Sequence, residues 1–486
     1  MSRSAGSSAA LIALTLAGCA AGPDFNMPAA SAVTGYTATP TPLETASSVG
    51  PLGEAQRFSD GIEAGAEWWR AFRSARLDAL VAEGLQNSPT LASSEATLRR
   101  AKELYDAKSG STLYPRFDAN LSAERKRFNP GSLGQTSNPT EFSLYNAGVG
   151  VDYQLDLAGA NRRALESLAA KADYQRYELE AARLTLAGNI VTAALTEARL
   201  AAQIAATEEI IRRLDEQLAI ARERLRLGQA SPDEVSSLET DLERTRAGLP
   251  ILSQQRQEND HLLAVLVGRA PTQGGAPAFT LAEFSLPADL PLAPPSDLMR
   301  RRPDIQAAEA LLHAANADYG VAVANLYPQI NVSANLGSQA LTTGALFGGG
   351  SAIWNVVGQL TQPLFDAGLP AEKRAALAAF DTAASNYQNV VLLALRNVAD
   401  VLRALENDAE RLAALARADA AAEESVLAKR RRYALGAASY VELLIAEQAA
   451  GRVRIELIGA QAQRLVDSAA FYQAMGAGAS VQEASN

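Results

Sequence analysis

The chain repeats itself once, and this internal repeat constrains its fold more than any other feature. Three segments of the first half return in the same order in the second half, about 210 residues later. The matched pairs are 114–121 with 327–336, 155–159 with 365–368, and 227–234 with 435–442. Because three matches in one order rarely arise by chance, we expect one architecture built twice.

Alternating apolar and polar side chains follow a Tyr-Pro pair in each half. In the first half the apolar positions are Phe117, Ala119, Leu121 and Ala123, then Val149, Val151, Tyr153 and Leu155 beyond a stretch rich in Gly, Ser, Asn and Pro. In the second half they are Ile330, Val332, Ala334 and Leu336, then Trp354, Val356, Gly358 and Leu360. This alternation predicts a β-hairpin in each half, with strands about as long as the 9–11 residues of a membrane barrel strand.

These four expected strands are too few to close a wide barrel. Either several chains contribute strands to one barrel, or the hairpins are not transmembrane and belong to a soluble sandwich. Beyond the N-terminal apolar run described below, the sequence has no segment that approaches a transmembrane helix.

The stretches between the strands predict very long helices. Between Gly159 and Gly228, and between Gly368 and Gly436, the only proline is Pro370, which the first turn of a helix tolerates. At about 1.5 Å per residue, each stretch gives a helix on the order of 100 Å long. Apolar side chains in the first stretch form a coiled-coil seam with one phase slip. They are Val191, Leu195, Ala198, Ala202 and Ala205, then Ile211, Leu214, Leu218, Ala221 and Leu225. Shorter helices are expected over 77–113 and 235–268.

Both long helices are expected to end in the same tight turn. Basic side chains precede Gly228 and Gly436, where a helix C-terminus favours cations and glycine supplies a left-handed cap. Ser231-Pro232-Asp233-Glu234 and Ser439-Tyr440-Val441-Glu442 each fit a Ser-x-x-Glu capping box that begins the next helix. As a first interpretation, the basic cluster and both glutamates are structural.

The N-terminus predicts a sorting signal. One positive charge, Arg3, is followed by an apolar run over 9–17, which is shorter than the about 20 residues of a membrane-spanning helix. The run leads into Leu16-Ala17-Gly18-Cys19, which resembles a bacterial lipobox. We expect cleavage before Cys19, the only cysteine of the chain, and its acylation. Ala20 is not the Asp that commonly retains lipoproteins at the inner membrane, so the expected location is the bacterial outer membrane, with a lipid anchor.

Composition excludes several kinds of site. The chain has 44 Lys and Arg against 54 Asp and Glu, a net charge of -10, with two His and one Cys. An acidic chain is a poor nucleic-acid binder, a single thiol excludes an intramolecular disulfide, and two isolated histidines cannot build an ordinary structural zinc site. The sequence also has no P-loop, zinc-protease or nucleophile-elbow motif. We expect no catalytic site, no metal and no cofactor.

Taken together, these residues resemble the outer-membrane factor family, the TolC- and OprM-like lipoproteins of the NodT type, over essentially the whole mature chain. The most specific motifs are Gly22-Pro23-Asp24-Phe25 after the lipobox, 68–72, 152–156, and Arg301-Arg302-Pro303-Asp304-Ile305 followed by Tyr327-Pro328. The resemblance implies a mixed α and β membrane protein, a trimer. Each protomer would give four strands to one shared twelve-stranded β-barrel and its helices to a long coiled-coil tunnel in the periplasm. It also implies a passive exit duct for small molecules, docked to a periplasmic adaptor and an inner-membrane pump, usually of the resistance-nodulation-division type.

In that family, residues just past the helical hairpins guard the closed end of the tunnel. By position, the resemblance implies a candidate aperture at Glu234, Glu442, Asp233 and Tyr433, and adaptor contacts at the hairpin tips Gly228, Ser231, Gly436 and Ser439. An aperture role for the two glutamates is compatible with their capping role. Ala438 stands where TolC has a gate arginine, so the locking interactions do not carry over.

The expected organisation has ten segments. They are a signal peptide (1–18), a lipidated extended and equatorial segment (19–76), a helical segment (77–114), a β-hairpin (115–156), a long helix with its return helix (157–268), an equatorial linker (269–297), a second helical segment (298–327), a second β-hairpin (328–365), a second long helix with its return (366–476) and a flexible tail (477–486). Two other functions stay open. The chain could be the duct of a type I protein secretion system, or a non-channel coiled-coil spacer lipoprotein of the envelope. The spacer explains the helices and Cys19 but not the symmetric strands, and the lipobox favours efflux over secretion.

Overall fold

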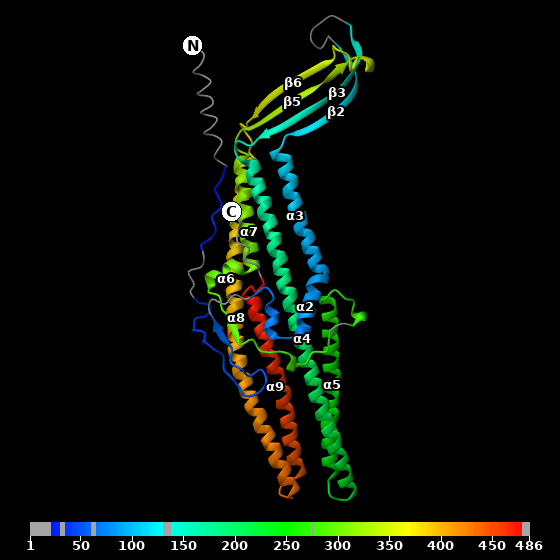
Figure 1. Ribbon diagram of the computed structural model, residues 1–486, viewed down its shortest axis with the longest axis vertical. Helices are drawn as coiled ribbons and strands as arrows, with labels where there is room; N and C mark the ends of the chain where they lie inside the picture. The colour runs from blue at the N-terminus through cyan, green and yellow to red at the C-terminus, as the bar shows by residue number, and fades with distance from the viewer. Residues whose placement is uncertain (1–20, 30–34, 60–64, 130–137, 275–276, 479–486) are drawn as a thin grey trace. The chain divides into compact units, whose positions relative to one another are not determined.

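The computed structural model describes residues 21–29, 35–59, 65–129, 138–274 and 277–478 (Figure 1). The chain divides into two compact units. Unit 1 comprises the described parts of 1–28, 97–175 and 307–387, and unit 2 those of 29–96, 176–306 and 388–486. Cys19 and the rest of the expected signal peptide lie outside the described residues.

Unit 1 contains a four-stranded antiparallel sheet with the strand order β2, β3, β5, β6. The strands are β2 (Arg116–Phe128), β3 (Thr140–Leu155), β5 (Gln329–Ala340) and β6 (Ala352–Thr361), and a short 3-10 turn, η5 (Thr343–Ala345), lies between the last two. Each half of the chain thus supplies one hairpin (Figure 1).

The register of the sheet separates its two faces. Phe117 pairs with Val151, Val149 with Leu336, and Leu336 with Trp354, so one face is apolar across all four strands. Its large side chains are exposed to solvent in the single chain, Leu121 and Trp354 by 80% and 76%. The opposite face carries amides that bond across strands. Asn335 donates to Asn355 at 3.2 Å, and Gln339 donates to Asn146 at 2.7 Å.

Four helices form the two long hairpins. The long members are α4 (Ala160–Arg226) and α8 (Leu369–Ala434), of 67 and 66 residues. Each turns directly into a return helix of 35 residues, α5 (Pro232–Leu266) after α4 and α9 (Tyr440–Ala474) after α8 (Figure 1). Pro250 lies inside α5 without ending it. The fold class expected from the sequence, long helices in a two-fold repeat with four strands, is therefore confirmed.

The apolar seam of α4 is buried on both sides of its phase slip. Val191, Leu195 and Ala198 are fully buried, and Leu214 and Leu218 are exposed by only 3% and 4%. Between these two runs, Ala205 is exposed while Thr207 is buried, which is the slip itself. None of the helices in the described ranges has the length and apolarity that crossing a bilayer would require.

Each half also contains a pair of shorter helices separated by one extended residue. The pairs are α2 (Ala75–Asn87) with α3 (Pro89–Leu113), and α6 (Pro295–Arg301) with α7 (Pro303–Ala324). The sequence predicted a helical segment in each place, 77–114 and 298–327. The helices break at Ser88 (ψ 120°) and at Arg302 (ψ 122°), since a residue before proline is pushed out of the helical region.

Short segments of unit 2 connect these helices. Strand β1 (Arg57–Ser59) pairs in parallel with β4 (Asp289–Pro291), and three 3-10 turns lie nearby in sequence, η1 (Trp68–Phe72), η3 (Pro271–Gln273) and η4 (Leu281–Glu283). Trp68 stacks on Tyr472 of α9 with ring centroids 5.5 Å apart. The fully buried Arg464 of α9 donates to the Leu52 carbonyl at 2.8 Å. These contacts attach the extended segments to the return helix.

Candidate functional site

The two helical hairpin turns have the same backbone. Gly228 and Gly436 have φ of +71° and +70°, and their numbers differ by 436 − 228 = 208. The residue after each glycine donates its N–H to the carbonyl four residues before that glycine, Gln229 to Arg224 at 2.7 Å and Ala437 to Arg432 at 2.8 Å. Both turns therefore use the left-handed glycine cap that the sequence predicted.

The N-caps of the return helices are equivalent only in part. Ser231 accepts the N–H of Glu234 at 3.2 Å, and Ser439 accepts the N–H of Glu442 at 3.2 Å. The reciprocal bond, from the serine N–H to the glutamate carboxylate, is present at Ser439 at 3.4 Å. The prediction of a full capping box is wrong for Ser231, because the Glu234 carboxylate is turned toward an arginine instead.

The first hairpin is stabilised by an ion pair between Arg224 and Glu234. Arg224 Nη1 lies 3.0 Å from Glu234 Oε1, and Arg224 Nη2 donates to the Gln229 carbonyl at 3.0 Å. The side chains of Arg224 and Glu234 are exposed by only 27% and 15%. The Arg224 guanidinium also lies over the ring of Tyr440, 5.5 Å from its centroid. This arginine therefore joins the first turn to the start of α9.

The second hairpin is stabilised by an ion pair in which the ammonium group of Lys429 bonds the Glu442 carboxylate. This carboxylate is exposed by 46%, about three times as much as that of Glu234. The bond from Lys429, followed by the bond from the Ser439 backbone, lowers the pKa of Glu442 below its ordinary value. Glu442 therefore presents a solvent-accessible carboxylate that stays ionised.

The other two aperture candidates occupy different environments. Asp233 is exposed in the first turn of α5, where a negative charge stabilises a helix N-terminus. The ring of Tyr433 lies 5.4 Å from that of Tyr440. Tyr440 is buried and packs in an apolar cluster that joins both hairpins, made of Leu214, Leu218, Ala221, Leu238, Leu242, Tyr440 and Leu444. Burial raises the pKa of the Tyr440 hydroxyl, which is buried without a hydrogen-bond partner in the described part of the chain.

Sequence reasoning missed one repeated pair of charges. Arg222 bonds Glu239 at 3.2 Å in the first hairpin, and Arg430 bonds Glu447 at 2.8 Å in the second. Both pairs span 17 residues and are related by the same offset of 208. The signal was present as an Arg and a Glu 17 residues apart in both halves, but we assigned these arginines only to the ends of the long helices.

The site offers no grouping suited to metal binding. Across the described ranges, no three His, Cys, Asp or Glu side chains gather in a way that could hold a metal ion. What the two hairpins do provide is a pair of matched turns that carry carboxylates of unequal exposure, held by basic side chains from the long helices. The structure brings Arg224, Glu234, Tyr433 and Tyr440 into one cluster, while Glu442 pairs separately with Lys429.

Comparisons with known proteins assign this architecture to a family. The family described as outer membrane efflux protein matches residues 80–269 and 295–477. The chain is 29% identical over 481 residues to the probable efflux pump outer membrane protein TtgC of Pseudomonas putida, covering 97% of this chain and 95% of that one. It is 30% identical over 425 residues to the pyoverdine export outer membrane protein OpmQ of Pseudomonas aeruginosa, covering 85% and 87%. The structure of the outer-membrane channel OprN matches with a TM-score of 0.84 at 26% identity, covering 94% of this chain and 99% of that one. The resemblance expected from the sequence is thereby confirmed, and the chain belongs to the outer membrane efflux protein family.

Proposed function

We propose that this chain is one protomer of a trimeric exit duct, the outer-membrane channel of a tripartite efflux system for small molecules. Its relatives TtgC and OpmQ are outer-membrane proteins of an efflux pump and of pyoverdine export. The chain itself supplies a passive route, and energy comes from an inner-membrane pump that a periplasmic adaptor connects to it. A pump of the resistance-nodulation-division type is the form we expect.

The observation that carries this proposal is the open sheet. Within the described residues, β2 and β6 each pair with a strand on one side only. An unpaired strand edge is not tolerated in lipid, since its backbone groups would lack hydrogen bonds. Three copies supply twelve strands, which closes the sheet by joining β2 of one protomer to β6 of the next.

The two faces of the sheet support the same arrangement. The exposed apolar face, with Leu121 and Val356, suits contact with lipid, while the amide face, with Asn120 and Asn355, suits a wet lumen. Leu121 and Val356 share their face with Val149 and Leu336, and Asn120 and Asn355 share theirs with Asn335, so closure of the sheet would place these amides inside.

The hairpins are the parts of the duct that we propose to face the adaptor and to narrow its periplasmic end. The tips Gly228, Ser231, Gly436 and Ser439 form the proposed adaptor contacts. Leu435, next to Gly436, exposes 82% of its surface and offers an apolar contact there. Glu234, Glu442, Asp233 and Tyr433 form the proposed aperture, with Glu442 as its most accessible acid apart from Asp233.

We further propose that Cys19 carries acyl chains that hold the protomer in the outer membrane. The lipobox supports this assignment, and several acyl chains on one cysteine anchor firmly, since each buried CH₂ contributes about 0.8 kcal/mol. Labelling cells with a clickable fatty acid tests it. The label is expected on the wild type and absent from Cys19→Ser, and equal label on both would refute acylation at this residue.

Thiol labelling tests the duct itself. In a Cys19→Ser background the chain has no other cysteine, so single cysteines can be placed at Leu121 or Val356 and at Asn120 or Asn355. The first two are expected to resist water-soluble thiol reagents in membranes and the last two to react. The particle mass in mild detergent should be that of a trimer. Equal labelling of the positions on both faces of the sheet, together with the particle mass of a monomer, would favour the envelope spacer instead.

A further inference from the structure

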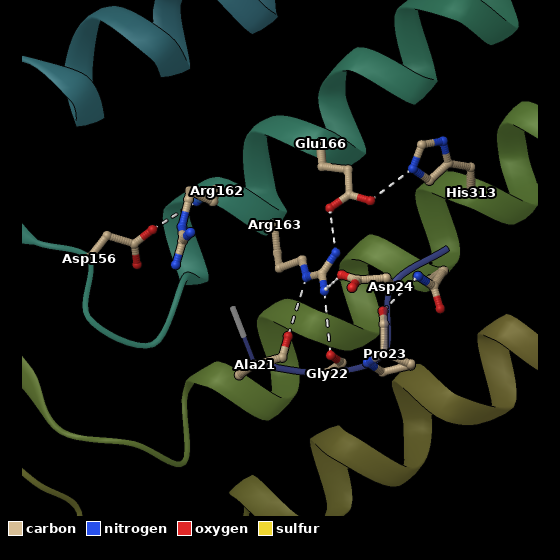
Figure 2. A network of polar contacts seen from close by, with 10 residues as sticks. Ala21, Gly22, Pro23, Asp24, Asp156, Arg162, Arg163, Glu166 and His313 are labelled. Carbon is tan, nitrogen blue, oxygen red and sulfur yellow. Dashed lines mark hydrogen bonds and ion pairs between the residues drawn. The ribbon is translucent and has the colours of Figure 1, made fainter. Parts of the chain in front are cut away.

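One polar network of unit 1 has no role in the proposed duct. It surrounds Arg163, in the first turn of α4, whose side chain is only 5% exposed (Figure 2). The guanidinium bonds Glu166 Oε2 and Asp24 Oδ1 at 2.7 Å each. It also donates to the carbonyls of Ala21 at 3.3 Å and Gly22 at 3.4 Å. Three of these four partners belong to the N-terminal segment.

Each residue of the Gly22-Pro23-Asp24-Phe25 motif has a partner, and Gly22 and Asp24 share Arg163. The Pro23 carbonyl accepts the side chain of Asn316 at 3.1 Å. The ring of Phe25 stacks on His313 of α7, with centroids 4.3 Å apart and an interplanar angle of 13°. His313 Nε2 lies 2.8 Å from Glu166 Oε1, so Glu166 joins the histidine to Arg163 (Figure 2).

Glycine is required at two points of close approach. Gly22 has φ +87°, and a Cβ on it would lie 2.8 Å from the Cα of Gly320. A Cβ on Gly320 would in turn lie 2.9 Å from the Arg163 side chain. The segment therefore rests directly on the backbone of α7. A methyl group on Gly22 would displace the segment, and one on Gly320 would displace the Arg163 side chain that binds it.

The bonds of this network favour the charged forms of Arg163 and Glu166. Burial disfavours the charged form of Arg163, but its bonds to Glu166 and Asp24 outweigh burial and raise the pKa of the guanidinium. Burial likewise disfavours ionised Glu166, and its bonds to Arg163 and His313 prevail and lower the pKa of that carboxyl. Without the N-terminal segment, the buried guanidinium would keep Glu166 but lose the Asp24 carboxylate and both carbonyls.

The network also fixes where the segment begins. The N–H of Ala21 donates to the carbonyl of Ala158 at 2.8 Å, in the connection between β3 and α4. Asp156 of the same connection accepts the N–H of Arg162 at 2.9 Å (Figure 2). Cys19 is two residues before Ala21, and two residues of chain reach at most about 7 Å.

We propose that Arg163, Glu166, His313, Asn316 and Gly320 form an anchor seat, which holds residues 21–25 so that the acyl chains of Cys19 enter the membrane at the base of β3. This inference rests on the proposed acylation of Cys19. The anchor is then a fixed point of each protomer, because Ala21 bonds Ala158, the chain neighbour of the partly exposed Leu157. Arg163 acts as a positioning residue.

The first test measures whether the segment is held. Met27, 66% exposed, is replaced by cysteine in the full chain and spin-labelled, and its mobility is recorded in detergent-solubilised trimers. The label is expected to be restrained in the wild type. The mobile fraction should rise several-fold in Arg163→Gln, Gly320→Ala and Asp24→Asn. The last change leaves both helices intact, so it answers the question even if the first two impair folding.

A matched control comes from the same helices. Lys171 of α4 bonds Asp318 of α7 at 2.9 Å through side chains that are half exposed, and this ion pair does not include any of the residues 21–25. Lys171→Gln is expected to leave the label restrained. A label that stays restrained in Asp24→Asn and in a folded Arg163→Gln trimer would overturn the seat.

The second test locates the acyl chains. Cells are fed a fatty acid that carries both a diazirine and an alkyne, then irradiated, and cross-linked peptides are mapped. Cross-links are expected in the wild type on the segment around Leu157 and to be several-fold fewer in Asp24→Asn, at equal total label. Equal cross-linking in both would overturn the positioning role. Absence of any label on the wild type would instead refute acylation and with it the anchor role, while the spin-label test, repeated in a Cys19→Ser background, still decides whether the segment is seated.

Discussion

The two helical hairpins have the same backbone turn but are stabilised by different ion pairs. In the first, Arg224 and Glu234 form an enclosed pair, while in the second, Lys429 and Glu442 form a pair that is open to solvent. The turns, the glycine caps and the bonds that the serine side chains accept are the same, and only the second cap has the reciprocal bond to its glutamate. The comparison teaches that the repeat preserved the turn geometry, whereas the electrostatic contacts of each turn became different.

One aromatic side chain underlies the difference. Tyr440 begins α9 at the position that Pro232 occupies in α5, offset by 440 − 232 = 208. Its ring fills the cluster between the hairpins and lies against Arg224. A proline at the same point could not cover the equivalent Arg432 in this way, so only the first arginine is enclosed.

The largest effect is expected from Tyr440→Ala. Loss of a buried aromatic ring should lower the free energy of unfolding by about 3 kcal/mol, because it leaves a cavity between the hairpins. Chemical denaturation in detergent, followed by tryptophan fluorescence, measures it. Tyr440→Phe is the control and should change stability by less than about 1 kcal/mol, since the buried hydroxyl has no partner in the described residues. Equal losses in both variants would show that the hydroxyl, and not the ring, joins the hairpins.

The next prediction compares the ion pairs of the two hairpins, Arg224 with Glu234 and Lys429 with Glu442. Arg224→Gln should cost about 1.5 kcal/mol, because it removes a charged hydrogen bond to a carboxylate that is mostly buried. Lys429→Gln should cost clearly less, since solvent screens its partner. The thermal midpoints of the two trimers, measured side by side, decide between them. A larger loss of stability from Lys429→Gln would show that the ion pair of the second hairpin contributes more than that of the first.

A third prediction concerns ion selectivity. The double variant Glu234→Gln, Glu442→Gln should assemble and reach the outer membrane, but it should show weaker cation preference in planar bilayers and less block by divalent cations from the periplasmic side. Because Glu442 is the more exposed acid, Glu442→Gln alone should produce most of the change. Reversal potentials in a salt gradient measure it. Unchanged selectivity in a folded double variant would mean that both residues act as caps alone.

The smallest expected effect is the pH dependence of the ion pair between Lys429 and Glu442. The pKa of Glu442 is lowered in the folded state, so its contribution is present above the unfolded pKa of a glutamate and is lost as pH falls through the lower folded value. The stability difference between wild type and Glu442→Gln should therefore be constant near neutral pH and vanish in acid, below the ordinary range of glutamate. Thermal midpoints from pH 7 downward follow it. A difference that persisted in strong acid would indicate a loss of packing instead of charge.

Much of the fold followed from local patterns. The alternation around Leu121 and Leu336 gave the strand faces, and the seam from Val191 to Leu218 gave a buried stripe of α4. Boundaries beside proline were harder to place, because the effect of Pro89 and Pro303 on the preceding residue interrupts a helical pattern without altering its composition. The capping box at Ser231 failed for a related reason. A local motif cannot show that Arg224 competes for the same carboxylate.

By itself, the sequence determined the elements of this protein and their repetition, since helical and strand periods, turn glycines and serine caps act over a few residues. Only the tertiary structure decided which charges meet. Arg163 bonds Asp24 across 139 residues, and Phe25 stacks on His313 over an even longer separation. Such partners are chosen by the packing of helices that are distant in the chain, where burial makes an unpaired charge costly, and no local pattern records that choice.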